Sequence, residues 1–134
     1  YEVSSYAKEG HRAKHNSAYW RMTPYLGLGP GAHAFFPPRR TVNVARTSTY
    51  IEAALRDDAI ESTEELDEET LSFERIMTGL RDLEDGVDIG DDWPRFGPSI
   101  KRQVALGNVW LKGDRVWLTE RGLRLMDSVL LDLL

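Results

Sequence analysis

The chain has 134 residues, of which 41% are hydrophobic and 29% charged, as is usual for one globular domain or a small domain joined to a piece of another. It contains no cysteine, which excludes disulfides, a thiolate nucleophile and a thiolate-ligated metal within this chain. The net charge is −5, and no apolar run approaches the roughly 20 residues that a membrane-spanning helix needs.

The N-terminal end shows no signal peptide, so we expect a cytoplasmic protein. The chain begins at Tyr1 without a methionine, in a segment that reads as a strand, which suggests a piece of a longer protein. Residues 1–60 carry a net charge of +3, with eight Lys and Arg against five Asp and Glu, whereas residues 61–134 carry −8. This shift in charge predicts a domain boundary near residue 60.

The first 60 residues predict short strands separated by loops and short helices. Gly29-Pro30-Gly31 forces a turn with close backbone approach, and Pro37-Pro38 breaks the chain again. In chain order we expect a strand over 1–7, a helix capped by Asn16 and ending at Trp20, a buried strand over 25–28, a strand over 41–45, and a helix capped by Thr47 or Ser48 and ending near Arg56. This order resembles part of an α/β layer, because two or three strands cannot close a barrel.

The second half changes to helical periodicity. The acidic run from Glu61 to Glu69 is predicted to be a linker that leads into a helix N-terminus, where the dipole favours carboxylates. One apolar face of that helix follows at helical spacing: Phe73, Ile76, Met77 and Leu80. Pro98 is predicted to start the next helix, which Gly107 ends.

The clearest local signal is a β-hairpin. Two apolar segments, 109–112 and 115–118, flank the two-residue turn Gly113-Asp114. The register pairs two sets of residues across the hairpin: Leu111 with Val116, and Trp110 with Trp117. One face is therefore aliphatic and consists of Val109, Leu111, Val116 and Leu118.

A final helix is predicted after the hairpin, with Thr119 as its cap. Its buried side is predicted from spacing: Leu123, Met126, Leu130 and Leu133. Helix, helix, hairpin and helix together indicate a winged-helix-like domain. Its charge of −8 argues against nucleic-acid binding, because phosphate contacts require a basic surface. We interpret the Trp110 and Trp117 face as a structural or domain-packing surface instead.

Three segments near the N-terminus resemble one protein family. They are Tyr-Glu-Val-Ser-Ser-Tyr-Ala at 1–7, His-Asn-Ser-Ala-Tyr-Trp at 15–20 and Tyr-Leu-Gly-Leu-Gly-Pro-Gly-Ala-His at 25–33. The pattern resembles the HemN/HemW family of radical S-adenosylmethionine proteins, which includes oxygen-independent coproporphyrinogen III oxidases and HemW-type heme chaperones. Weaker matches in the later half extend the resemblance over essentially the whole chain, as a C-terminal fragment.

The resemblance implies an α+β fold in two parts. Residues 1–60 would be the C-terminal strands and helix of a radical S-adenosylmethionine partial (β/α) barrel. Residues 61–134 would be the winged-helix-like C-terminal domain of HemN-type proteins. The second domain would then open with the helix that carries Phe73 and end with the helix that follows Thr119.

The resemblance also implies cofactors and a choice between two activities. Family members hold a 4Fe-4S iron–sulfur cluster through three cysteines and bind S-adenosylmethionine at its open iron. This chain lacks the cluster cysteines and should be inactive in such chemistry alone. One branch decarboxylates coproporphyrinogen III in porphyrin biosynthesis, and the other binds heme and delivers it to acceptor proteins, including membrane-associated respiratory enzymes. The segment 15–20 favours the chaperone branch.

For S-adenosylmethionine, the resemblance indicates a pocket edge formed by Ser4, Gly29, Gly31 and Ala32. Ser4 stands where the decarboxylase branch has an aspartate. Backbone N–H groups of the glycine run would face polar groups of a ligand. The alternative is that the glycines only permit a tight turn.

For heme, the resemblance indicates His15 as the candidate iron ligand, with Tyr19 and Trp20 providing flat apolar surface. The alternative is that His15 orients the loop while both aromatic residues lie in the core. Four basic residues would meet heme propionates or else form a solvated loop: Arg12, Lys14, Arg39 and Arg40. His33 would point toward the pocket and His11 to solvent. We predict neither a catalytic residue nor a structural metal site in this chain.

Overall fold

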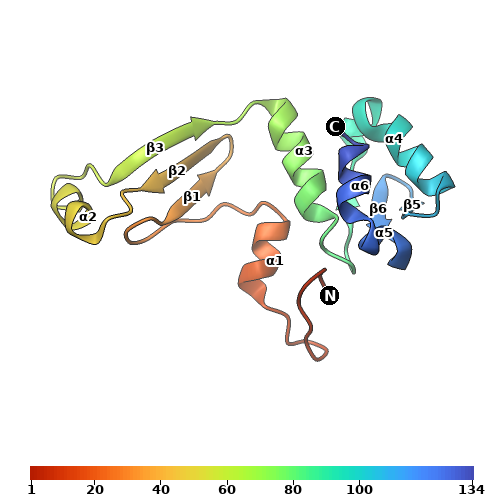
Figure 1. Ribbon diagram of the computed structural model, residues 1–134, viewed down its shortest axis with the longest axis horizontal. Coiled ribbons are helices and arrows are strands. Elements are labelled where there is room, and N and C mark those ends of the chain that lie inside the picture. The colour runs from red at the N-terminus through yellow and green to blue at the C-terminus, as the bar shows by residue number, and fades with distance from the viewer. The chain divides into compact units, whose positions relative to one another are not determined.

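The computed structural model describes residues 1–134 and divides them into two compact units. Unit 1 contains residues 1–22 and 72–134, and unit 2 contains residues 23–71. Helices and strands both occur, which confirms the mixed α and β class. In chain order (Figure 1) the elements are α1 (Lys14–Trp20), β1 (His33–Phe36), β2 (Arg39–Asn43), α2 (Thr47–Ala54), β3 (Ile60–Glu65), α3 (Glu68–Gly79), β4 (Val87–Asp88), the 3-10 turn η1 (Gly90–Asp92), α4 (Trp93–Ala105), β5 (Val109–Lys112), β6 (Arg115–Leu118), α5 (Glu120–Arg124) and α6 (Met126–Leu131).

Unit 2 is built on an antiparallel sheet in the order β1-β2-β3. The first part of the acidic segment predicted to be a linker instead belongs to the strand β3, so that prediction is wrong over residues 61–65. Its glutamates lie opposite arginines of β2, with Arg39 paired to Glu65 and Arg40 to Glu64. Opposite charges across a ladder stabilise it, which explains a strand whose six residues are all exposed.

The charge shift at residue 60 therefore does not coincide with a boundary between the units. Residues 60–65 pair with β2 inside unit 2, and the units divide at 22/23 and 71/72. The charge changes sign there because β2 is basic and its ladder partner β3 is acidic. The assignment of residues 1–60 to a barrel and 61–134 to a winged-helix-like domain remains a prediction.

The buried strand predicted over residues 25–28 is not observed. Tyr25 makes a single bridge to Phe35, and Leu26 and Leu28 are 73% and 87% exposed. Phe35 is the buried member of β1. The carbonyl groups of the intervening glycines bind a side chain rather than a neighbouring strand, which prevents a ladder from continuing.

Both predicted helices of the N-terminal half exist, but their caps differ. The first begins at Lys14, so that Asn16 lies inside α1 and is not its cap. The second begins after Arg46, and no side chain caps it, so neither Thr47 nor Ser48 has the predicted role. Helix boundaries depend on one or two hydrogen bonds and are poorly determined by local sequence.

The segment 1–7 is not a strand. Within unit 1, Glu2 makes one isolated bridge with Asp82, and the Leu83 N–H donates to the Tyr1 carbonyl at 3.1 Å. Asp82 lies in the turn after α3, and the turn pairs with the N-terminal segment at this residue alone. The N-terminal residues are therefore held in unit 1 by this bridge and by side chains, with Val3 against the core and Ser4 beside Arg81, rather than by a ladder.

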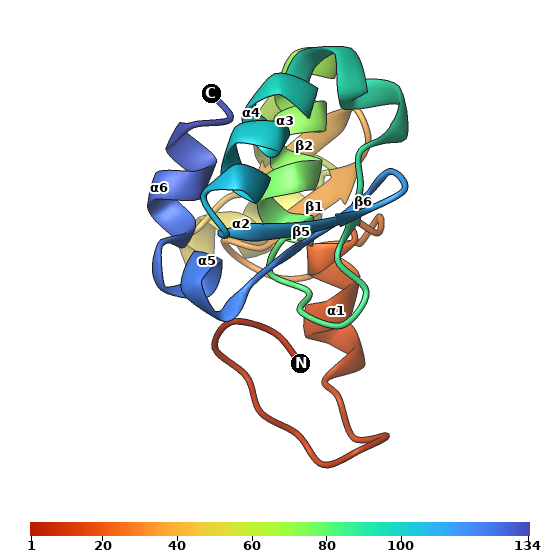
Figure 2. The same ribbon diagram turned by 90° about the vertical axis from the view of Figure 1, so that its right-hand side faces the viewer.

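The hairpin of unit 1 agrees with the predicted register. In the hairpin of β5 and β6 (Figure 2), Leu111 lies opposite Val116 and Trp110 opposite Trp117. The short strand β4 adds a third strand on the β6 side. The aliphatic face enters the core, where each fully buried Val or Ile stabilises the fold by about 1.5–3 kcal/mol. The residues with least exposure in that core are Ile76, Leu80, Ile89, Phe96, Ile100, Val109, Val116 and Val129.

The helix before the hairpin starts earlier than predicted. It begins at Trp93, with a proline in its first turn, so Pro98 lies inside α4 and does not start it. Pro94 is the residue that takes the helix-initiating place, where a missing N–H costs nothing. Gly107 ends the helix with φ of +73°, as predicted.

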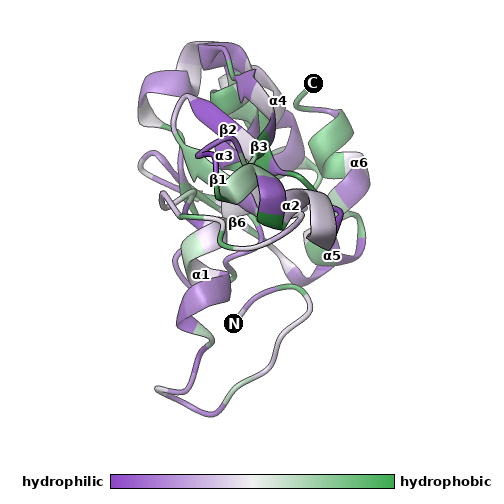
Figure 3. Ribbon diagram, turned by 90° about the vertical axis from the view of Figure 1, so that its left-hand side faces the viewer, coloured by the Kyte–Doolittle hydropathy of each residue, from purple (hydrophilic) through white to green (hydrophobic).

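The final helix is capped as predicted but is not continuous. The Gly122 N–H donates to Thr119 Oγ1 at 2.9 Å. Leu125 then leaves the helical region, with φ −115° and ψ 20°, and separates α5 from α6. Met126 and Leu133 are buried as predicted, whereas Leu123 and Leu130 are half-buried. The α6 ribbon carries both apolar and polar colours in Figure 3.

A buried side chain, Asn108, joins the end of α4 to the start of α5. Its amide nitrogen donates to Gln103 Oε1 at 2.8 Å, and its Oδ1 accepts from Arg121 Nε at 3.1 Å. Its carbonyl accepts the Thr119 N–H at 2.9 Å. Gly122 packs against the same carbonyl so closely that a Cβ would stand 1.8 Å from the oxygen. This contact admits no side chain at position 122.

We predict that Gly122→Ala destabilises the protein by about 3 kcal/mol, because the backbone of residue 108 must move away from α5. Urea denaturation followed by circular dichroism measures the change in the free energy of unfolding. Gly90→Ala is the matched control, since the nearest atom to its Cβ is a side-chain oxygen at 3.3 Å. Equal effects of the two substitutions would contradict the close approach.

A second prediction concerns pH. Arg102 and then Gln103 hydrogen-bond the Asp132 carboxylate, at 2.6 Å for Arg102 Nη2 and 2.7 Å for Gln103, and these bonds lower the pKa of Asp132. A lowered folded-state pKa gives stability that is present above the unfolded pKa of about 3.9 and is lost as pH falls through the folded value. Asp132→Asn should therefore destabilise the protein at pH 7 and less so in acid.

The control is Asp127→Asn on α6, an exposed residue near Asp132 in the sequence. Thermal unfolding of the three proteins between pH 7 and pH 2 measures the difference. A constant gap between wild type and Asp132→Asn at every pH would contradict an ionic contribution.

Candidate functional site

The residues singled out by sequence lie on both units. Helix α1 in unit 1 carries His15, Tyr19 and Trp20, and Ser4 precedes it. The glycine-rich loop, residues 27–32, belongs to unit 2.

His15 and Tyr19 come together on α1. They are one helical turn apart, and their rings meet edge to face with centroids 4.7 Å apart and an interplanar angle of 78°. Both side chains are exposed, so neither ring belongs to the core. The imidazole is thus accessible to a ligand from solvent, with a phenol ring against its edge.

Trp20 lies on a different side of the helix. Its ring is half-buried beneath the Arg81 guanidinium, whose Cζ stands 4.7 Å from the ring centroid. A cation over an indole face is stabilising. The predicted trio is therefore divided, with His15 and Tyr19 at the surface and Trp20 packed within unit 1.

Charged contacts that the sequence did not reveal hold α1 in place. Arg21, which follows the helix, lies 2.5 Å from Asp85 and 3.4 Å from Asp82. The Asp82 carboxylate is buried and also accepts the N–H groups of Glu84 and Asp85 at 3.2 and 2.9 Å. In the sequence, the only sign of this contact between Arg21 and the turn 82–85 is that the turn is rich in acidic residues. A solvated loop has the same composition, so the sign is not specific.

A side chain overlooked by the sequence analysis shapes the glycine-rich loop. The Asn43 amide donates to the carbonyls of Gly27 and Gly29, at 3.3 and 3.0 Å. A Cβ on Gly27 would stand 2.2 Å from the backbone oxygen of His33, so only glycine fits there. Asn43 also donates its own N–H to the Ala32 carbonyl at 2.9 Å.

Two N–H groups of the loop are used internally. Gly31 donates to the Val44 carbonyl at 3.0 Å, and Ala32 to the Gly29 carbonyl at 3.3 Å. These two amides are therefore not directed at a ligand. Gly29 has open space where a side chain would be, with φ of +104°. The open side of the loop therefore lies at Gly29.

Ser4, the other residue considered for S-adenosylmethionine, is an exposed residue of unit 1, and its Oγ lies 3.4 Å from Arg81 Nη2.

Most of the basic residues considered for propionates already have carboxylate partners. Arg12 pairs with Glu84, Arg39 with Glu65 and Arg40 with Glu64. Lys14 is exposed at the start of α1. His11 is exposed, as expected, with Nδ1 2.9 Å from the Glu9 carbonyl, and His33 is an exposed residue of β1.

Comparison with known proteins agrees with the motifs. A heme chaperone HemW of Bacillus subtilis is 33% identical over 96% of this chain and 36% of its own length. A heme chaperone HemW of Mycobacterium tuberculosis is 32% identical over the whole chain and 34% of its own length. The chain belongs to the HemN/HemW family. Relatives extend to a mitochondrial radical S-adenosyl methionine domain-containing protein 1 of Danio rerio, 34% identical over 97% of the chain.

The fold agrees with the same family. Coproporphyrinogen III oxidase (HemN) of Escherichia coli, a radical SAM enzyme, superposes with a TM-score of 0.59 at 14% identity, over 83% of this chain and 28% of the oxidase. Protein-family models give no match. The chain spans about a third of the length of the curated HemW relatives. No helix is both long and apolar enough to cross a membrane.

We predict that Asn43→Ala loosens the glycine-rich loop without unfolding the sheet. Two hydrogen bonds of about 1 kcal/mol each are lost, so the amides of Gly31 and Ala32 should exchange with deuterium about thirtyfold faster. Asn16→Ala on α1 is the matched control. Unchanged protection of both amides in Asn43→Ala would contradict the role of that side chain.

Proposed function

We propose that this chain is part of a heme chaperone that binds heme and delivers it to acceptor proteins. The observation that carries the proposal is the similarity of nearly the whole chain to proteins named heme chaperone HemW, from Bacillus, Mycobacterium and Escherichia coli. The acceptors would include membrane-associated respiratory enzymes, and the protein would work in the cytoplasm.

The exposed pair on α1 supports a heme-binding role. An accessible neutral imidazole is the usual protein ligand of heme iron, and the Tyr19 ring beside His15 would contact the porphyrin edge. Lys14, an exposed cation at the start of the same helix, would pair with a propionate. Trp20 would act indirectly, because its stacking on Arg81 helps to fix α1.

The second candidate is an oxygen-independent coproporphyrinogen III oxidase. The superposition on HemN favours it, because the two chains share a fold. The chaperone has more support, since the HemW relatives are 29–33% identical and the oxidase 14%. Production of protoporphyrinogen IX from coproporphyrinogen III by the longer protein would favour the oxidase.

The cofactors of the family would involve this chain only in part. The chain has no cysteine, so the iron–sulfur cluster would be held elsewhere in the protein. S-adenosylmethionine bound at that cluster supplies radical chemistry in the family. The open side of the loop at Gly29, with Gly31 and Ala32, would line one edge of its pocket, and Ser4 would offer a hydroxyl. Asn43 would keep that edge in shape.

The domain assignment is also proposed from the family. Residues 1–60 would complete a radical S-adenosylmethionine barrel, and residues 61–134 would form the winged-helix-like domain. The order of α3, α4, the β5–β6 hairpin and the terminal helices supports the second assignment.

We predict that His15→Ala weakens hemin binding by about tenfold or more, because an axial iron bond is lost. Titration of the chain with hemin, followed by the Soret band, measures the dissociation constant and the position of the band. The change should include a shift of the Soret band, which a loss of stability alone does not produce.

Two other histidines provide matched controls. His11→Ala and His33→Ala remove exposed imidazoles from a loop and from β1 and should bind hemin like the wild type. If all three variants retain wild-type affinity and spectra, His15 is not the ligand. If all three lose affinity equally, binding is nonspecific and the assignment to α1 is wrong.

A further inference from the structure

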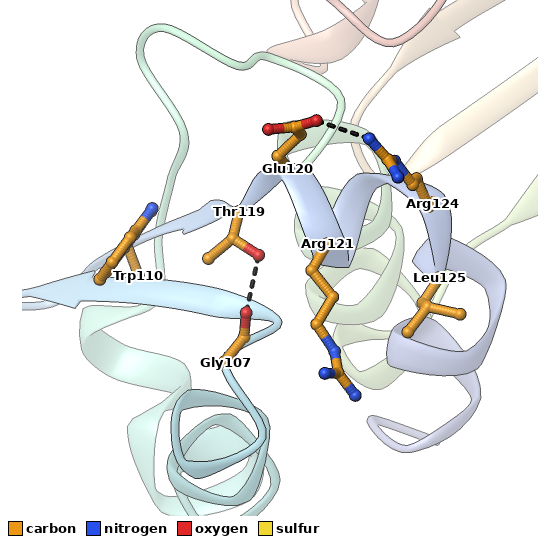
Figure 4. Close-up of a pocket in the computed structure, with 7 residues that line it drawn as sticks. All are labelled: Gly107, Trp110, Thr119, Glu120, Arg121, Arg124 and Leu125. Atoms are coloured by element: carbon orange, nitrogen blue, oxygen red, sulfur yellow. Dashed lines mark hydrogen bonds and ion pairs between the residues drawn. The ribbon is translucent and has the colours of Figure 1, made fainter.

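An open hollow of about 820 Å³ lies in unit 1, apart from the residues discussed for heme and S-adenosylmethionine. We call it the Trp110 hollow. Figure 4 shows Trp110 of β5 on one side, and Arg121, Arg124 and Leu125 of the α5 segment on the other. Both sides belong to the same unit, so its shape depends on one compact body.

The two tryptophans of the hairpin have different surroundings. Trp117 is half-buried, and its Nε1 donates to the Glu84 carbonyl at 3.0 Å, so it serves the fold as the sequence suggested. Trp110, directly opposite, is 67% exposed. An exposed tryptophan beside arginines has the composition typical of the energetic centre of a protein–protein interface.

The two arginines of the hollow are oriented by hydrogen bonds, but no buried carboxylate neutralises their charge. Arg121 is oriented through its Nε, which donates to Asn108 Oδ1, a neutral oxygen. Arg124 pairs with Glu120 at 2.6 Å, but both side chains are exposed, and such a pair is weak and easily exchanged. The hollow therefore carries two cations and one anion in the half of the chain whose net charge is −8.

We propose that the Trp110 hollow docks a segment of a partner protein in which an apolar side chain is flanked by carboxylates. The apolar side chain would pack on the Trp110 indole. The carboxylates would pair with Arg121 and with Arg124, where they displace Glu120, since guanidinium groups bind carboxylates bidentately. The proposal does not depend on heme binding, because the hollow shares no residue with the α1 site.

The test uses the 134-residue chain and three fluorescein-labelled twelve-residue peptides. The first has one central leucine flanked on each side by two glutamates, the second replaces the glutamates with lysines, and the third replaces the leucine with alanine. Fluorescence anisotropy should show the acidic leucine peptide binding at least about tenfold more tightly than the other two. Its affinity should fall as salt is raised from 50 to 300 mM, because exposed charges are screened.

Variants assign the binding to the hollow. Trp110→Ala and Arg121→Glu should each weaken binding of the acidic leucine peptide by about tenfold or more. Lys112→Ala, on the same strand, is the matched control and should bind like the wild type. Circular dichroism verifies folding, and Arg124→Gln offers a milder charge change that leaves the Asn108 contact intact, with an expected loss of about threefold.

Three results would overturn the proposal. The first is that the lysine peptide binds as tightly as the glutamate peptide, and the second is that Trp110→Ala retains full affinity for the acidic leucine peptide. The third is self-association of the chain that Trp110→Ala abolishes while the peptide does not compete, which would identify a second copy as the occupant. None of these results bears on the hemin titration.

Discussion

The contacts of one buried asparagine are the constraint on which much of unit 1 depends. Asn108 is 6% exposed, and all its polar groups have partners. Its side-chain amide nitrogen and its backbone N–H donate to the Gln103 side chain and carbonyl, its Oδ1 accepts from Arg121, and its backbone carbonyl accepts the Thr119 N–H. A buried polar group left without a partner costs about 1–3 kcal/mol. The end of α4, the start of β5 and the start of α5 are therefore held in one arrangement.

That arrangement extends to both ends of the C-terminal half. Gln103, the partner of Asn108, also donates to the Asp132 carboxylate. Arg102 of α4 binds the same carboxylate, so that α4 is joined to the segment after α6. Through Arg121 the arrangement sets the guanidinium that borders the Trp110 hollow. The surface proposed for a partner is thus built on a rigid polar junction, because a guanidinium oriented in advance loses less entropy when it binds.

In unit 2, too, the side-chain amide of an asparagine holds a loop in one arrangement. Asn43 donates to two carbonyls of the glycine-rich loop, which a regular strand would otherwise have satisfied. The loop is thereby kept out of the sheet, with its open side at Gly29. In both units a single amide side chain shapes the surface to which we assign a function, while the regular ladders and helices provide the support.

Local sequence was sufficient for features whose partners are close along the chain. The hairpin register from Val109 to Leu118, the Thr119 cap and the Gly107 stop were all predicted, because a two-residue turn, a capping hydroxyl and a glycine each act within a few residues. The motifs at 15–20 and 25–33 also identified the family without any structure.

Tertiary structure decided the features whose partners are distant. The strand β3 exists because its glutamates meet the arginines of β2, and α1 is held by Arg21 at Asp82 and Asp85. Likewise, the separation of Trp20 from His15 and Tyr19 follows from the Arg81 guanidinium above the Trp20 ring. The sequence by itself determined the family, the hairpin and the local caps. Only the tertiary structure decided which predicted site residues share a surface, because that depends on charges and amides separated by tens of residues.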